Sequence, residues 1–174
     1  KTEDDLHLDL RAISMRYLFG PRTMRTEEQQ EIYANTGSGT INGASDTHKD
    51  IEAQFFRDLA TNKGVTDTQI VEAASQFKSA FDAFDNRLGS RSYLLGEAVS
   101  VLDIAWYIYA VRLVNAGYPL RRLHKNVGAW FDKLDARSEF HREVAMPPPL
   151  IAARDALHAE QERQGDSLEA VAGL

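Results

Sequence analysis

Ser100 and Asp103 are the residues whose types and spacing most directly suggest chemistry. They lie where a polar loop gives way to a mostly apolar run over residues 101–111. A serine beside a carboxylate can belong to a hydrolytic relay, but a relay needs a histidine, and none lies close to them in the sequence. The same spacing is that of a capping box, in which each side chain accepts a hydrogen bond from the other residue's backbone N–H. We therefore predict a helix start here and a structural role for both residues.

Two other features suggest chemistry that their spacing does not support, and the lack of cysteine excludes several further kinds of site. Asp5, His7 and Asp9 would point in different directions on a helix, so they do not form a metal site. The glycine-rich segment 37–43 has no preceding strand and no following Gly-Lys-Ser/Thr, so we expect a loop between helices and not a phosphate-binding loop. The chain has no cysteine, which excludes disulfides, thiolate metal sites and cysteine nucleophiles. We expect no metal.

Charge and hydropathy exclude further classes of partner. The formal net charge is -6 and no run is rich in Lys or Arg, so we expect no nucleic acid partner. The apolar run over residues 101–111 is too short to cross a bilayer, so we expect no membrane span. The lack of cysteine fits a reducing compartment, and we expect a cytoplasmic protein. Because the chain begins at Lys1 and not at Met, we expect a fragment or a processed product.

The spacing of apolar residues is helical almost throughout. Leu6, Leu10, Ile13 and Tyr17 recur at four- and three-residue steps and predict a first helix that ends near residues 20–21. No stretch alternates as a strand would. Further helices are expected over residues 26–34, from 46 or 47 to about 62, over 66–88, 100–115, 126–136 and 138–145, and from 150 onward, after an extended break at residues 146–149 and before a frayed polar tail.

Three of these helices carry specific expectations about packing. Ile51, Phe55 and Leu59 are expected to form the inner face of the third helix. The helix that begins after Ser100 is apolar on nearly every side and is expected to run, buried all round, through the centre of the fold. The helix over residues 66–88 has a narrow seam with strict 4-3 spacing, suited to packing against a nearly parallel helix, formed by Ile70, Ala74, Phe77, Phe81, Phe84 and Leu88.

These elements predict an all-α fold, a bundle of about seven to nine helices with no sheet. The 174 residues suit one compact domain with a sizeable core. We expect residues 1–150 to form the helical bundle, and residues 151–174 to form a C-terminal helix and tail that pack on it or fray from it.

The order of motifs around the capping box resembles the C-terminal helical domain of the glutathione transferase family. Leu95-Gly96, Ser100 and Asp103-Ile104 have the spacing of that domain's capping-box signature. The resemblance extends over about residues 70–145, and one departure is Leu102, where the family often has alanine. The other residues that carry it are Phe81, Asp82, Leu88, Tyr93, Leu94, Pro119, Leu120, Val127, Trp130, Phe131, Leu134, Arg137 and Phe140.

The resemblance implies a division of labour between two domains. In the family an N-terminal thioredoxin-like domain binds glutathione and supplies the catalytic residue, and the helical domain supplies most of the pocket for a hydrophobic electrophile. This sequence has no βαβ pattern, so we expect the helical half without its thioredoxin-like partner. No catalytic residue can be carried over, and the chain alone is expected to be inactive. The resemblance also implies glutathione as co-substrate, a detoxifying transferase activity and a homodimer.

Helical geometry and the resemblance together suggest a few binding residues. If Leu6 and Leu10 face the core, Arg11, Met15 and Leu18 fall on an adjacent stripe that mixes charge and apolar surface, as a wall for the electrophile would. Asp5 lies near the position where family members place an acid that reaches the glutathione amine. The alternative for these residues is a solvated or dimer-packed face. Candidate dimer surfaces are residues 1–17 and the seam over residues 70–88.

Three functions remain open from the sequence. The first is the hydrophobic co-substrate half of a glutathione-dependent transferase. The second is a non-catalytic domain of the same shape that is used for protein assembly, and the acidic charge disfavours it mildly. The third is an unrelated helical bundle with a chance capping box, which the ordered series of motifs makes least favoured.

Overall fold

The computed structural model describes residues 3–19, 26–36, 40–41, 44–45 and 47–174, with the backbone alone for residues 3–5, 40–41, 44–45 and 47–48. The elements in chain order are α1 (Glu3–Ser14), a π-helix η1 (Met15–Phe19), α2 (Glu27–Asn35), β1 (Thr40–Ile41), β2 (Ala44–Ser45), α3 (Thr47–Thr61), α4 (Asp67–Leu88), α5 (Val101–Asn115), α6 (Leu120–Leu123), α7 (Lys125–Asp135), α8 (Ser138–Val144), α9 (Pro148–Gln164) and α10 (Leu168–Ala172).

The all-α prediction is confirmed, with one small correction to the expectation that no sheet forms. β1 and β2 pair as an antiparallel ladder of two residues each, within the segment expected to be a loop. So short a ladder has no sequence signal, because two residues cannot show the alternation that marks a strand. The short helices α6 and α10 were also missed, since each is no longer than about one turn.

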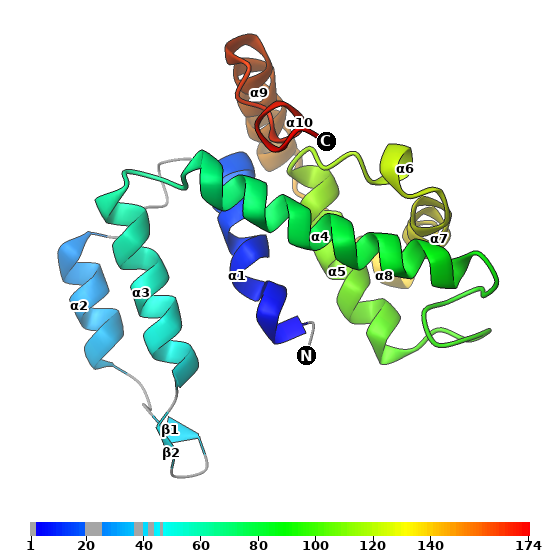
Figure 1. The fold of residues 1–174 in the computed structure, drawn as a ribbon, viewed down its shortest axis with the longest axis horizontal. Coiled ribbons are helices and arrows are strands. Elements are labelled where there is room, and N and C mark those ends of the chain that lie inside the picture. Colours follow the sequence, from blue (N-terminus) through cyan, green and yellow to red (C-terminus); the bar gives the residue numbers. More distant parts are fainter. Residues whose placement is uncertain (1–2, 20–25, 37–39, 42–43, 46) are drawn as a thin grey trace.

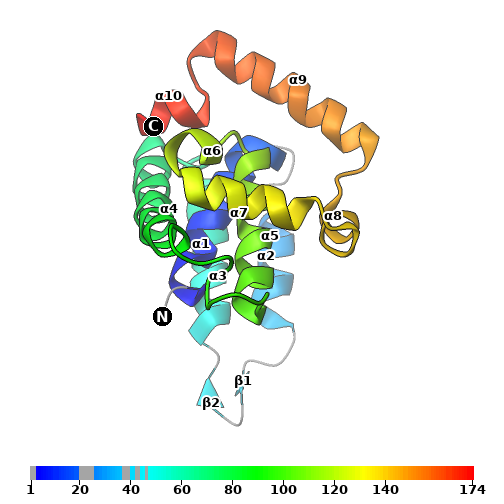
Figure 2. The same cartoon turned by 90° about the vertical axis from the view of Figure 1, so that its right-hand side faces the viewer.

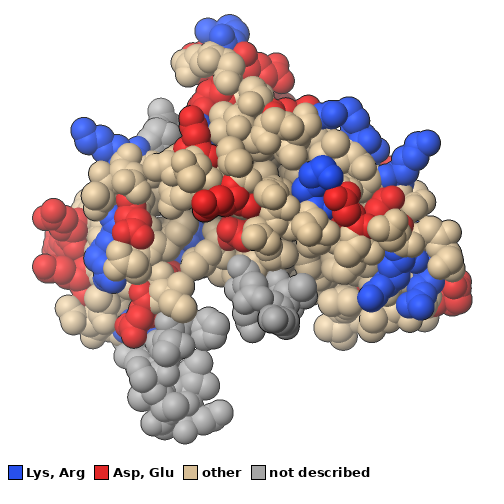
Figure 3. Space-filling model, viewed as in Figure 1, with Lys and Arg blue, Asp and Glu red and all other residues tan. Residues whose placement is uncertain are grey.

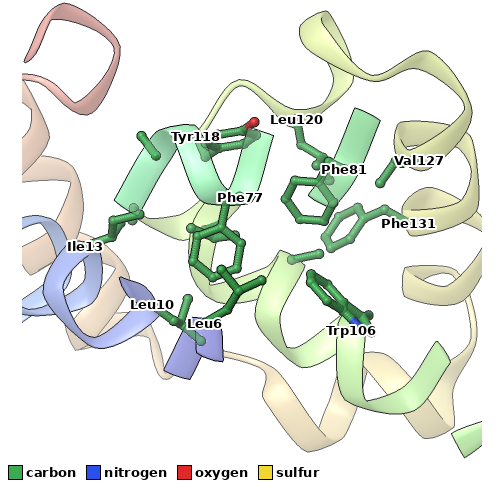
Figure 4. Packing of buried hydrophobic residues seen from close by; sticks show 14 of the residues in the cluster. Leu6, Leu10, Ile13, Phe77, Phe81, Trp106, Tyr118, Leu120, Val127 and Phe131 are labelled. Carbon is green, nitrogen blue, oxygen red and sulfur yellow. The ribbon is translucent and has the colours of Figure 1, made fainter. Parts of the chain in front are cut away.

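The core lies between α1, α4, α5 and α7 (Figure 4). Phe81 of α4 is its centre: the centroid of its ring lies 5.8 Å from that of Trp106, 5.7 Å from that of Tyr118 and 5.5 Å from that of His124. Aromatic pairs at such tilted and edge-on geometries add to the stabilisation from burial alone. The seam predicted for α4 is thus used inside the chain, with Phe84 partly buried at its edge.

Two parts of the chain lie outside this core. The antiparallel pair α2 and α3 projects to one side of the bundle (Figure 1). At another side α9 crosses over the end of the bundle, and the chain returns through α10 to its C-terminus (Figure 2). Arg11, in the last turn of α1, contacts the hairpin through Glu52 and Phe56 on α3, and η1, which follows directly, contacts α9.

The starts of the long helices are capped in ways that the sequence encodes. Thr66 and Gln69 form a capping box at α4, and Ser100 and Asp103 form the one predicted at α5. Helix α7 has no side-chain cap of its own. Its backbone N–H groups at 126 and 127 instead donate to the Asp85 carboxylate, over 2.7 and 2.9 Å. This tertiary cap fixes the start of α7 against the end of α4.

The Asp103 carboxylate does more than cap its own helix. It is fully buried, and Oδ1 accepts from the backbone N–H of Leu94 and from the Trp130 indole, each over 2.9 Å. Oδ2 accepts from the Ser100 backbone N–H at 2.9 Å and from its hydroxyl at 2.5 Å. A single side chain therefore joins the loop before α5, the start of α5 and the middle of α7.

Two expectations about buried faces are wrong. The helix α5 is not buried all round, because Val101, Ile104 and Ile108 are 81%, 46% and 43% exposed. These three positions share a face that no helix of the described chain covers. In α3 the inner residues are Phe56 and Leu59, whereas Ile51 is exposed. The spacing of apolar residues predicts that one side of α3 is apolar. It does not predict how α3 is rotated about its own axis against the bundle, so it does not identify the residues that face inward.

The C-terminal part also differs from the expected break and frayed tail. Helix α9 begins at Pro148, at the first helical position where proline's fixed φ is compatible and its missing N–H is not needed. Helix α10 places Leu168 in the core cluster. A single leucine in a polar segment forms no repeating apolar pattern, so the sequence does not predict that this segment packs on the core. The proposed division at residue 150 stays a prediction, and it falls inside α9.

We predict that Asp103→Ala lowers the free energy of unfolding by about 3 kcal/mol or more, because four buried or part-buried donors lose their acceptor. Chemical denaturation of the purified chain measures this. The matched control is Asp50→Ala, which removes an exposed carboxylate on α3 and is expected to change stability far less. An Asp103→Ala protein with an unchanged midpoint would contradict the structural role.

The same network gives stability a defined pH dependence. Burial alone would raise the pKa of Asp103 above its ordinary value of 3.8, but the hydrogen bonds from Leu94, Ser100 and Trp130 together lower it. A carboxyl with a lowered pKa in the folded state stabilises the fold at pH values above 3.8, and this contribution is lost as the pH falls through the folded pKa. Acid unfolding monitored by circular dichroism should therefore shift to higher pH in Asp103→Ala.

Tyr17 provides a second stability prediction. Its side chain is fully buried, and its hydroxyl has no hydrogen-bond partner in the described part of the chain. Burial raises its pKa to about 12. Because an unsatisfied buried hydroxyl is unfavourable, Tyr17→Phe should leave the free energy of unfolding unchanged or raise it by about 1 kcal/mol. A clear loss of stability in urea denaturation would show that the hydroxyl has a partner.

Candidate functional site

The candidate site is the side of α1 and η1 that faces α3. Arg11 lies at its centre: its guanidinium forms an ion pair with Glu52 and lies 5.5 Å from the centroid of the Phe56 ring, both on α3. Nη2 also lies 2.9 Å from His7 Nε2. Because Glu52 and Phe56 are four residues apart on α3, they present one face to the arginine. Arg11, predicted as part of a binding wall, therefore also holds the α2–α3 hairpin against the bundle.

Met15 and Leu18 continue the stripe into the π-helix η1. Both are half-buried, and Leu18 packs against the core. A π-helical turn is wider than an α-helical turn and often occurs at functional sites. Here the backbone carbonyls that it displaces find partners on α9, since Gln161 donates to Arg16 O over 3.2 Å and His158 Nε2 lies 3.1 Å from Tyr17 O. Helix α9 therefore supports the turn that carries the predicted apolar wall.

Arg16 fixes the same turn from the other side. Its guanidinium forms ion pairs with Asp166, before α10, and with Asp67 at the start of α4, the latter over 2.7 Å. It also donates to Val65 O over 3.2 Å. Burial alone would lower the pKa of Arg16, but the two carboxylates raise it. The π-helix is thus held by two segments that are far apart in the sequence, residues 65–67 and residues 158–166.

Arg112 is a candidate residue that the sequence analysis missed. It is half-buried near the end of α5, and its Nη2 donates to the Ser14 hydroxyl over 3.0 Å. Ser14 itself is buried, on the same side of the first helical segment as Arg11 and Leu18. The signal for Arg112 was present, because it is the one basic residue of an otherwise largely apolar helix. Nothing in the sequence indicates that α5 turns this residue toward α1.

The structure places the other sequence-predicted residues apart from this surface or leaves them undescribed. Ser100 and Asp103 are at the opposite end of α5 from Arg112, and the groups that contact Asp103 include no histidine. The side chain of Asp5 lies outside the described part of the chain, as does most of the glycine-rich segment 37–43. The roles of Arg11, Met15, Leu18 and Asp5 in binding stay predictions.

Two further surfaces bear on the expected partners. The apolar side chains of α1 and of the α4 seam are buried within the chain, so only the outer faces of these helices remain for a second copy, and the homodimer stays a prediction. Between α2 and α3 the surface has a hollow of about 230 Å³. It is lined by Glu27, Gln30, Glu31, Tyr33, Ala34, Ala53, Phe56 and Arg57.

Figure 3 shows one face of the molecule in the orientation of Figure 1. Acidic and basic side chains are interspersed over this face. Among the described residues no group of three or more His, Asp or Glu side chains could hold a metal ion. Within the same residues no helix is long and apolar enough to cross a membrane.

Comparison with known proteins places this architecture in a family. The family model for the glutathione S-transferase C-terminal domain matches residues 44–133, just over half of the chain, from the short ladder through most of α7. The curated protein "Probable glutathione S-transferase GSTF1" of Oryza sativa subsp. japonica is 29% identical over 95 residues, which are 54% of this chain and 42% of that protein. The match therefore spans less than half the length of this relative. No solved structure matches significantly.

The matched segment contains the capping box at Ser100 and Asp103 and the helix α5 that it starts. It also contains Trp130, whose indole donates a hydrogen bond to the Asp103 carboxylate. The resemblance seen in the sequence is therefore confirmed up to residue 133, and Leu134, Arg137 and Phe140 lie beyond the matched segment. This chain belongs to the family of glutathione S-transferase C-terminal domains.

Proposed function

We propose that this chain is the co-substrate-binding half of a glutathione-dependent transferase, in which the thiolate of glutathione is conjugated to a small hydrophobic electrophile. The observation that carries the proposal is the exposed apolar stripe on α5, formed by Val101, Ile104 and Ile108. Leu95, in the turn before α5, is exposed beside the start of the same helix. Apolar side chains gathered in this way mark a surface that another protein surface covers.

A thioredoxin-like domain is the partner that we propose for this stripe. Contact along α5 would place its glutathione site next to α1, because α1 packs against α5 within the bundle. Glutathione is a charged tripeptide that needs backbone pairing along its length and a donor that lowers its thiol pKa. The helical domain offers one wall, and one wall leaves most of a small ligand in water. Catalysis is therefore assigned to the partner domain, with Asp5 of this chain as a candidate contact for the glutathione amine.

The wall for the electrophile would be the stripe of Arg11, Met15 and Leu18. Its apolar part, Met15 and Leu18, is half-buried. The exposed half of each side chain can therefore contact a small aromatic ligand while the core beneath stays covered. Arg11 is held at one edge by Glu52 and Phe56, which fixes its guanidinium in one place. A rigid wall of this kind keeps the ordering cost of binding low.

We predict that chlorodinitrobenzene, a neutral aromatic electrophile, binds with roughly millimolar affinity and shifts the NMR methyl signals of Met15 and Leu18. We also predict that glutathione, titrated into the same chain by calorimetry, gives no micromolar dissociation constant. The methyl of Ala34, in the hollow between α2 and α3, serves as the internal control. Shifts confined to Ala34 would contradict the proposed wall. A micromolar glutathione constant would contradict the proposed division of labour, and no shift with either ligand would favour an assembly domain.

A further inference from the structure

Arg112 carries a charge for which the described chain provides no counterion. Its guanidinium has five N–H donors, and the contact it makes is with the Ser14 hydroxyl. None of the carboxylates in the described residues forms an ion pair with it. The residue is nonetheless half-buried, which weakens its hydration. Most buried or half-buried arginines are paired with an acid, so this site is incomplete as it stands.

Ser14 explains how the guanidinium is positioned. The Ser14 hydroxyl donates its own proton to Leu10 O over 2.6 Å, so its oxygen is turned to accept from Arg112. The contact between Ser14 and Arg112 fixes Arg112 against one face of α1. Arg11, three residues before Ser14, lies on the same face. Arg11 is paired with Glu52. Arg11 and Arg112 are therefore neighbouring guanidinium groups, and of the two only Arg11 has a carboxylate partner among the described residues.

The charge on Arg112 is unfavourable where it lies. Burial lowers the pKa of Arg112 below its ordinary range, and the neighbouring charge of Arg11 lowers it further. A glutamine at this position could donate to Ser14 without that penalty. Residues that are unfavourable for the fold by themselves are characteristic of functional sites, where a ligand supplies the missing interaction.

We infer that Arg112, assisted by Arg11, binds the carboxylate of the electrophilic co-substrate, so that the substrate class is an apolar molecule with an anionic end. The inference rests on the proposed function and names its substrate. The carboxylate accepts from the free N–H groups of Arg112, as a planar guanidinium favours. The apolar body then extends along Met15 and Leu18, which follow Ser14 on the same side of the helical segment.

The test compares naphthoate, an aromatic carboxylate, with naphthamide, its uncharged counterpart of nearly the same shape. Each is titrated by calorimetry into the 174-residue chain, into Arg112→Gln and into Arg87→Gln. Arg87 is exposed in the last turn of α4, so its variant makes the same change in net charge at another place. We expect naphthoate to bind about tenfold more tightly than naphthamide, a difference of about 1.4 kcal/mol, in the parent chain and in Arg87→Gln. In Arg112→Gln the ratio should fall to about one.

A stability measurement separates binding from a structural role. Because glutamine keeps a donor for Ser14 and removes the repulsion from Arg11, Arg112→Gln should unfold at the same urea concentration as the parent chain or at a higher one. A lower midpoint together with an unchanged ratio of affinities would show that Arg112 is a structural tie and would overturn the inference.

The remaining outcomes distinguish this inference from the proposed function. Equal affinity of the parent chain for the acid and the amide would overturn the inference and leave the hydrophobic wall in place. Binding of neither probe would overturn both. Micromolar binding of glutathione that is lost in Arg112→Gln would assign the arginine to the carboxylates of glutathione and would overturn its assignment to the co-substrate.

Discussion

The buried carboxylate of Asp103 is the constraint on which the rest of the structure depends. It accepts hydrogen bonds from Leu94, Ser100 and Trp130, which belong to a loop, a helix start and a separate helix. A carboxylate without those donors would be strongly unfavourable at zero exposure, and the donors would be equally unfavourable without the carboxylate. The arrangement is therefore satisfied only when all three segments are in place, and it sets the direction in which α5 crosses the bundle.

The direction of α5 has consequences at both of its ends. At its start the helix leaves Val101, Ile104 and Ile108 uncovered, and this is the apolar surface that we propose for a partner domain. Near its end it carries Arg112 to Ser14 on α1. The π-helical turn that follows Ser14 is held from the outside by α9 and by the ion pairs of Arg16. The same bundle geometry thus produces both the surface proposed for a partner domain and the wall proposed for the substrate.

The sequence predicts the features of this structure that depend on residues close to one another in the chain. The capping box, the apolar period of α1 and the seam of α4 all follow from residues within a few positions of each other, and the structure contains them. What the sequence does not predict depends on how helices are rotated against distant neighbours. The inward position of Phe56, the exposure of Ile104, the docking of Leu168 and the approach of Arg112 to Ser14 are all of this kind.

Amide hydrogen exchange at Leu94 and Ser100 tests the central role of the Asp103 carboxylate most directly. Both amides precede α5, and neither belongs to a regular helix or strand. If the carboxylate holds them as described, they exchange as slowly as core amides such as that of Ala110, by opening of the whole fold. Exchange at the rate of the neighbouring exposed residue Glu97 would mean that the two hydrogen bonds open independently, and it would contradict the account.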